Sequence, residues 1–266
     1  QSLAEIEALT VLAPLHQPQI VRLINAIREL KPNLPQTASF DTAFHRTMSE
    51  TAQRFALPRG MFDEGIRRYG FHGLSYKFIA AELRRRDPGT ASGRVVVAHL
   101  GSGASLCAMD NGISRDTSMS FTTLDGIPMG SRAGAIDAGA VTYLLRDLAM
   151  TVDEVEHALY ERSGLRGLSG ISNDVKTLLE SEDPRAAFAL DYFVLKVAQH
   201  AAAMAVSMGG IDAFVFTGGI GENAAPVREA VLARLAFLGP FRPLVIPANE
   251  ERMMAIHAKA LLEARG

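Results

Sequence analysis

The sequence predicts an α/β fold, because strand-like runs alternate with long helical segments. Two such runs, over residues 94–99 and 104–109, stand between helical segments. A third, "IDAFVFT", leads into glycines and then into another helical segment. With 266 residues and 48% hydrophobic content, the chain is also long enough to bury a sizeable core.

The N-terminal third is expected to be mostly helical. Over residues 18–30, apolar side chains recur at helical spacing, and "KPNLP" then ends the helix. The stretch "TASFDTAFHRTM" that follows is predicted to be short and β-like. A second helix is expected over residues 75–86, where three arginines suit a helix C-terminus and Pro-Gly marks a turn.

Two adjacent strands are expected next, separated by Gly101-Ser102-Gly103. Asp110-Asn111-Gly112 then forms a hairpin turn, since Asn and Gly tolerate the positive φ that such turns need. In the remaining chain, helices are predicted over 138–149 and 151–162, and the second opens with a Thr151-x-x-Glu154 capping box.

A long helix should run from Asp183-Pro184 to Gly209-Gly210, because these pairs suit a helix start and a helix end. Charged and polar residues interrupt its apolar run, which favours a buried helix over a membrane span. The strand "PLVIP" and a helix over "NEERMMAIHAKALL" complete the order.

Composition narrows the class of partner. A formal net charge of −2 leaves no basic excess for a nucleic acid or an anionic membrane, so neither is expected. The single cysteine, Cys107, excludes an internal disulfide and favours a reducing, cytoplasmic location. No signal peptide is visible, and Gln1 is interpreted as an internal position of a longer protein.

The sharpest local motif is "FTGGIGENA", in which a strand ends in glycines and opens a helix. Such a turn can present backbone N–H groups to a phosphate. Residues 219–224 also match the dinucleotide pattern G-x-G-x-x-A, yet few residues remain for the further βα units of a Rossmann domain. Mononucleotide binding, nicotinamide binding and a purely structural turn stay open at this point.

Other candidates are single polar residues in suggestive settings. Arg132 stands among small residues in "GIPMGSRAGAID", where a guanidinium can pair with phosphate or carboxylate. His72 in "RRYGFHG" and His16 in "LAPLHQP" could act as donors or acids, or could be structural. Asp41 and Glu250 could organise a hard cation, or could be caps or surface carboxylates.

Seven motifs taken together, in chain order, resemble the acetate kinase family. The resemblance runs from about residue 12 to 255, and it rests on "LAPLHQP", "FDTAFHRTM", "RRYGFHGLSYKFIA", "HLGSGASLCAMDNGISRDTSMSFTTLDGIPMGSRAG", "GLSGISNDVK", "FTGGIGENAAPVRE" and "VIPANEERMMA". It implies the two-domain, ribonuclease H-like fold of sugar kinases, heat-shock ATPases and actin, with an incomplete N-terminal domain. Residues 1–41 and 250–266 would belong to that domain, and 42–249 would form the nucleotide-binding domain.

The resemblance implies reversible phosphoryl transfer from ATP to acetate, which gives acetyl phosphate and ADP. It also implies Mg²⁺, with Mn²⁺ as an alternative, and a homodimer. Propionate kinase, and a non-catalytic member that only binds nucleotide, are the alternatives within the family. A nicotinamide-dependent dehydrogenase is the alternative outside it.

The resemblance also assigns residues. Asp41, His72 and Arg132 correspond to the catalytic groups, and Glu250 corresponds to the Mg²⁺ ligand. Three stretches correspond to the nucleotide-binding segments: His99, Leu100, Gly101, Ser102 and Gly103; Asp174, Val175 and Lys176; and Gly219, Ile220, Gly221, Glu222 and Asn223.

Several features depart from the family pattern. Ser102 stands where the family usually has Asn, Lys176 where it has Arg, and Ala135 where it has Asp. The segment over residues 237–247 is shorter than its counterpart. The family's N-terminal phosphate loop would precede Gln1, so the chain as given is expected to be weakly active or inactive.

Overall fold

The computed structural model describes residues 2–8 and 17–264, and the chain divides into two compact units. The first unit comprises Gln1–Phe40 and Met254–Gly266, and the second comprises Asp41–Met253. His16, in the first of the seven motifs, lies outside the described residues.

The first unit is helical in its described part. It contains α1 (Ser2–Ala8), α2 (Gln17–Leu30) and most of α14 (Glu250–Glu263), whose first turn belongs to the second unit. The helix expected over 18–30 is therefore confirmed. Ser39 Oγ lies 3.1 Å from His257 Nδ1, which links the segment after α2 to α14.

A mixed sheet forms the centre of the second unit, and its strand order is β3-β2-β1-β4-β5. The strands are β1 (Arg94–Leu100), β2 (Ala104–Asp110), β3 (Ile113–Thr117), β4 (Ala213–Thr217) and β5 (Arg242–Val245). The first three pair antiparallel, whereas β4 is parallel to β1 and β5 is parallel to β4. Asn111 and Gly112 turn the second hairpin with φ of 53° and 72°, as the sequence predicts.

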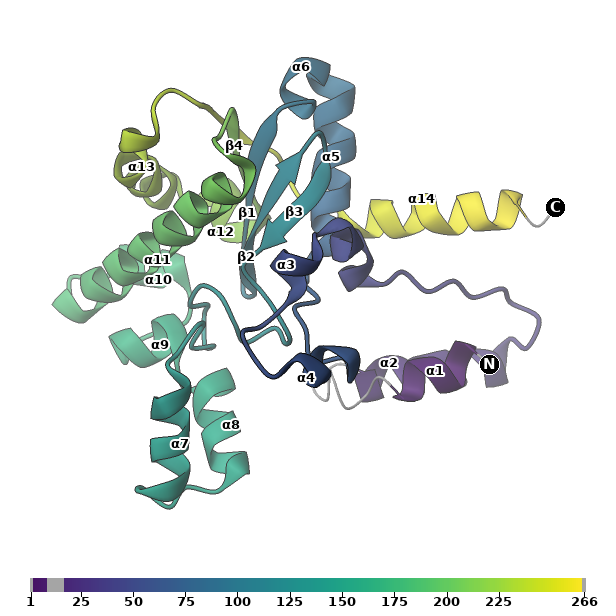
Figure 1. Cartoon of the computed structure of the whole chain (residues 1–266), viewed down its shortest axis with the longest axis horizontal. Coiled ribbons are helices and arrows are strands. Elements are labelled where there is room, and N and C mark those ends of the chain that lie inside the picture. Colours follow the sequence, from purple (N-terminus) through teal and green to yellow (C-terminus); the bar gives the residue numbers. More distant parts are fainter. Residues whose placement is uncertain (1, 9–16, 265–266) are drawn as a thin grey trace. The chain divides into compact units, whose positions relative to one another are not determined.

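Both faces of the sheet are covered by helices (Figure 1). Side chains alternate along β1, so that Val96 and Ala98 face one apolar cluster while Val95 and Val97 face the other. The first cluster includes residues from α9 (Gly164–Ser169), α10 (Val175–Leu179), α11 (Pro184–Met208) and α13 (Ala225–Arg234). The second includes residues from α5 (Gly73–Arg86), α6 (Pro88–Ala91) and the start of α14.

The predicted helix ends are confirmed where a cap is present. Thr151 and Glu154 form a reciprocal capping box at the start of α8 (Val152–Glu161), which follows α7 (Ala138–Arg146). Asp183 caps α11, and Gly209, with φ of 70°, ends it. No helix in the described ranges is both long and apolar enough to span a membrane.

The β-like prediction for "TASFDTAFHRTM" is wrong, because Asp41–Thr47 forms a 3-10 helix, η2. Tertiary hydrogen bonds from Asp41 and His45 hold this turn and override its weak strand propensity. Three shorter elements complete the second unit: α3 (Glu50–Gln53), α4 (Arg59–Asp63) and η3 (Ala236–Leu238), and α12 (Gly218–Asn223) follows β4 directly.

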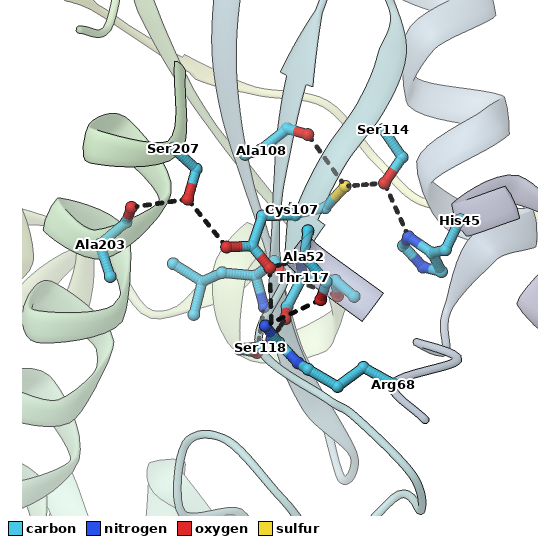
Figure 2. Close-up of polar contacts among 12 residues, drawn as sticks. His45, Ala52, Arg68, Cys107, Ala108, Ser114, Thr117, Ser118, Ala203 and Ser207 are labelled. Carbon is cyan, nitrogen blue, oxygen red and sulfur yellow. Dashed lines mark hydrogen bonds and ion pairs between the residues drawn. The ribbon is translucent and has the colours of Figure 1, made fainter. Parts of the chain in front are cut away.

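A buried polar network ties η2 to the sheet (Figure 2). His45 Nδ1 lies 2.8 Å from Ser114 Oγ on β3, and Cys107 Sγ lies 3.5 Å from the same oxygen. On its other side, His45 Nε2 lies 2.9 Å from the carbonyl oxygen of Phe71. Burial lowers the pKa of His45, so a neutral ring joins β3 to the segment that leads into α5.

Candidate active site

Two glycine-rich turns meet at the carboxyl ends of β1 and β4. Because β1 and β4 are parallel, with His99 opposite Thr217, the residues that follow each strand emerge side by side. Gly218 has a φ of +78°, and a Cβ there would lie 2.7 Å from the Leu100 carbonyl oxygen. This close approach requires glycine, and it brings the two turns together.

A pocket of about 510 Å³ opens between these turns and α10. It is lined by Gly101, Ser102, Asn173, Asp174, Val175, Lys176, Leu179, Gly219, Ile220, Asn223 and Ala224. The pocket therefore joins all three stretches that the sequence assigns to nucleotide binding. A volume in this range is ordinary for a small-molecule site.

Five of the assigned nucleotide residues do not line this pocket. Leu100 and Gly221 pack into the protein interior, while Gly103 and His99 lie toward His72. The Glu222 carboxylate accepts hydrogen bonds from two backbone N–H groups, those of Gly218 and Ala248, at 3.0 Å each. The Glu222 side chain thus stabilises the conformation of the turn after β4.

Three lining residues were not predicted, namely Asn173, Leu179 and Ala224. Leu179 lies one helical turn beyond Val175 and Lys176 on α10, and this spacing is a signal that could have identified it. Asn173 and Ala224 directly adjoin two of the assigned stretches. Both also lie within the motifs that carry the family resemblance, and this position is the signal that points to them.

His72 marks the start of α5 in a constrained backbone conformation. Its φ of 56° is left-handed, which is uncommon for a residue with a side chain. Asp41 stabilises this turn, because its carboxylate accepts from the N–H of His72 at 2.5 Å and of Leu74 at 3.0 Å. Residues 66–72, which lead into this turn, form an irregular segment.

The imidazole of His72 stacks on that of His99, with ring centroids 4.3 Å apart. Burial is the main cause that lowers the pKa of His72 to about 4, and the Arg132 cation adds to the effect. Burial and the His72 ring likewise lower the pKa of His99 to about 3. Both rings are therefore neutral at pH 7, and each can still donate through an N–H group.

Arg132 approaches the same turn from the loop before α7. A Cβ built on Gly103 would lie 3.2 Å from His72 Nε2 and 3.8 Å from Arg132 Nη1. Arg132 donates to the carbonyl of Thr123 at 3.3 Å, and among the described residues no carboxylate forms an ion pair with it. A neutral donor and an unpaired cation thus converge beside Gly103.

Asp41 and Glu250 are the two acidic residues that the sequence proposes as organisers of a cation. Burial raises the pKa of Glu250, and repulsion from Asp41 contributes next. Within the described ranges there is no cluster of three or more His, Cys, Asp or Glu side chains suited to a metal. The two carboxylates of Asp41 and Glu250 are a donor set that fits Mg²⁺, because this ion is commonly held by one or two carboxylates together with substrate phosphates and water.

The family model described as "Acetokinase family" matches residues 1–255. A protein named acetate kinase from Rhodopseudomonas palustris is 52% identical over 238 residues, covering 89% of this chain and 60% of that protein. Another, from Nitrobacter hamburgensis, is 46% identical and covers 97% of this chain and 69% of the relative. The chain thus spans 60% of the first relative's length.

Solved structures give the same result for the fold. A propionate kinase from Francisella tularensis superposes with a TM-score of 0.91 at 37% identity, covering 96% of this chain and 72% of the other. An acetate kinase from Porphyromonas gingivalis superposes with a TM-score of 0.89 at 33% identity, covering 98% and 72%. The fold expected from the sequence motifs is thereby confirmed.

Proposed function

Because the chain belongs to the acetokinase family, we propose that the full-length protein transfers a phosphoryl group reversibly between ATP and acetate, giving acetyl phosphate and ADP. The observation that carries this proposal is the convergence of His72 and Arg132 at Gly103, beside the pocket. The second unit would be the nucleotide-binding domain, and the pocket would take the nucleotide.

The chemistry of phosphoryl transfer fits this arrangement. The transition state is loose and carries negative charge on its equatorial oxygens, so positioned cations and donors stabilise it most. Arg132 offers a forked cation, and His72 offers a neutral N–H donor. Acetate is already ionised at pH 7, so Asp41 is not needed as a general base and can orient its neighbours instead.

Asp41 and Glu250 are the residues proposed to hold Mg²⁺. Both Asp41 oxygens accept a backbone N–H, yet each keeps a further lone pair for a cation. When bound, the metal ion would neutralise charge on the phosphates of the nucleotide. Mn²⁺ takes similar oxygen ligands and is the alternative.

Trapping of the acyl phosphate with hydroxylamine tests the proposed activity. The full-length protein is incubated with MgATP and acetate, propionate or butyrate in parallel, and the hydroxamate is measured. We expect product with acetate, and the three rates rank the carboxylates. Product with none of the three would refute the proposal and favour a non-catalytic, nucleotide-binding member of the family.

Propionate is the second candidate substrate, and the solved propionate kinase, which covers 96% of this chain, is the observation that favours it. One methylene in an apolar pocket is worth only about 1–3 kcal/mol, so the two substrates differ by a modest factor. The dinucleotide alternative has no support, since the family matched along 1–255 is that of acetate kinases. Cytoplasmic location and a homodimer remain predictions.

Ser102 allows a test of the nucleotide pocket. Its side chain is exposed at the turn and lines the pocket, and the longer amide of Ser102→Asn is expected to reach a phosphate that serine contacts loosely or through water. We expect the Kd of the full-length protein for ADP, measured by calorimetry, to fall about fivefold, as one added hydrogen bond of about 1 kcal/mol predicts.

The matched control for this change is Ser92→Asn, because Ser92 is also exposed but lies outside the pocket. It should leave the Kd unchanged. Equal or weaker ADP affinity in Ser102→Asn would contradict the phosphate-facing interpretation of this turn.

A further inference from the structure

Two buried hydroxyl groups form a hydrogen-bonded series that ends at His72, and the sequence assigns a role to neither of them. His72 Nδ1 lies 2.8 Å from Ser105 Oγ, and the same oxygen lies 2.5 Å from the phenol oxygen of Tyr76. Both Ser105 and Tyr76 are fully buried, with 0% exposure. Tyr76 follows His72 by one turn of α5, whereas Ser105 comes from β2.

The protons shared by Tyr76, Ser105 and His72 can be assigned by counting hydrogen-bond donors and acceptors. Among the described residues, Ser105 Oγ is the one hydrogen-bond partner of the Tyr76 phenol. If Ser105 donated to Tyr76, the phenol proton would be buried without an acceptor, which costs about 1–3 kcal/mol. If Tyr76 donates to Ser105, then Ser105 can donate to His72 Nδ1 and every proton has a partner.

The second arrangement determines the tautomer of His72. A neutral imidazole that accepts at Nδ1 carries its proton on Nε2. Nε2 is the atom that lies next to Gly103, on the side where Arg132 also reaches the turn. The ring would then present a donor, rather than a lone pair, toward the reacting phosphoryl group.

We propose that Tyr76 and Ser105 are positioning residues that hold His72 in the Nε2–H tautomer, with its donor directed at the site beside Gly103. The proposal rests on the proposed function for its catalytic consequence, but the tautomer itself does not. Asp41 fixes the backbone of His72 at the start of α5, and the hydroxyl pair fixes its ring.

Imidazole ¹⁵N NMR tests the tautomer directly. The full-length protein is labelled with ¹⁵N-histidine, and the resonances of His72 are assigned by their loss in His72→Gln. We expect Nδ1 to be pyridine-like and Nε2 to be pyrrole-like in the wild type. In Ser105→Ala, which removes the donor to Nδ1, the two nitrogens should move toward averaged shifts, and Ser105→Thr should restore them.

The matched control is Ser75→Ala. Ser75 Oγ lies 2.8 Å from His99 Nδ1, so this change removes the equivalent hydroxyl from the neighbouring ring. It should alter the resonances of His99 and leave those of His72 in place. Tyr76→Phe provides a second variant should Ser105→Ala fold poorly. It keeps the Ser105 hydroxyl but removes the phenol that donates to it, so Ser105 can either donate to His72 Nδ1 or accept from it.

Kinetics separate this role from a merely structural one. We expect Ser105→Ala to lower kcat between about 10- and 100-fold, comparable with losing the second partner of a functional histidine, with little change in KM for ATP or acetate. Ser105→Thr should recover most of that loss. A pyrrole-like Nδ1 in the wild type would overturn the proposal. The Nε2–H tautomer in a protein without kinase activity would refute only the proposed function.

Discussion

Replacing Arg132 with alanine in the full-length protein is expected to lower kcat by about 10²–10³-fold, which corresponds to the loss of one preorganised transition-state contact. Arg132 shares its side of the Gly103 turn with His72, and no carboxylate in the described part of the chain neutralises it. Its charge is therefore available to a developing phosphoryl anion. Steady-state kinetics with acetate and MgATP measure the effect.

The fork of the guanidinium should matter as well as its charge. Arg132→Lys keeps the cation but loses bidentate geometry, so we expect an intermediate kcat. Arg146→Ala is the matched control, because Arg146 is exposed in the last turn of α7, away from the pocket lining. Wild-type kcat in Arg132→Ala would refute the role assigned to this residue.

Local chemistry made much of the fold predictable. The Asn111-Gly112 turn, the Thr151-Glu154 capping box and the Asp183-Pro184 helix start each depend on residues adjacent in sequence, and the structure confirms all three. The glycine turns after β1 and β4 were also visible. That they form one pocket follows from the parallel pairing of these strands, which local sequence does not encode.

What escaped prediction depends on contacts between distant segments. Ser105 and Tyr76 lie in separate segments, and nothing in their local sequence indicates that Ser105 joins the Tyr76 phenol to His72. The helical form of η2 depends on bonds from Asp41 to the start of α5 and from His45 to β3, which override its local preference. The Glu222 carboxylate accepts from the N–H groups of Gly218 and Ala248, and the second of these contacts joins segments that are distant in sequence.

The loop that carries Arg132 is held by the backbone at the start of α9. Three N–H groups of this segment, those of Ser163, Leu165 and Arg166, donate at 2.9 Å to carbonyls of residues 129–131. Gly164 lies in the middle of this contact with a φ of +60°. A Cβ there would lie 2.2 Å from the Met129 carbonyl oxygen and 2.7 Å from that of Arg132, far closer than carbon and oxygen can approach.

Gly164→Ala is therefore expected to destabilise the protein and to displace Arg132. The left-handed backbone alone costs alanine about 1 kcal/mol, and relieving the overlap should add about 2 kcal/mol or more. Gly209→Ala is a matched control, because Gly209 has a φ of +70° but nothing within 4 Å of its Cβ position. Urea unfolding should thus give a loss of about 3 kcal/mol for Gly164→Ala and about 1 kcal/mol for Gly209→Ala.

A measurement of kcat distinguishes Gly164→Ala from Gly209→Ala independently of their stability. Under conditions where both are folded, kcat should fall in Gly164→Ala, because the carbonyls that must move belong to the loop carrying Arg132, and it should stay near wild type in Gly209→Ala. Equal stability losses in the two variants would show that the α9 contact tolerates a side chain. Unchanged kcat in a destabilised Gly164→Ala would show that Arg132 reaches the site without this support.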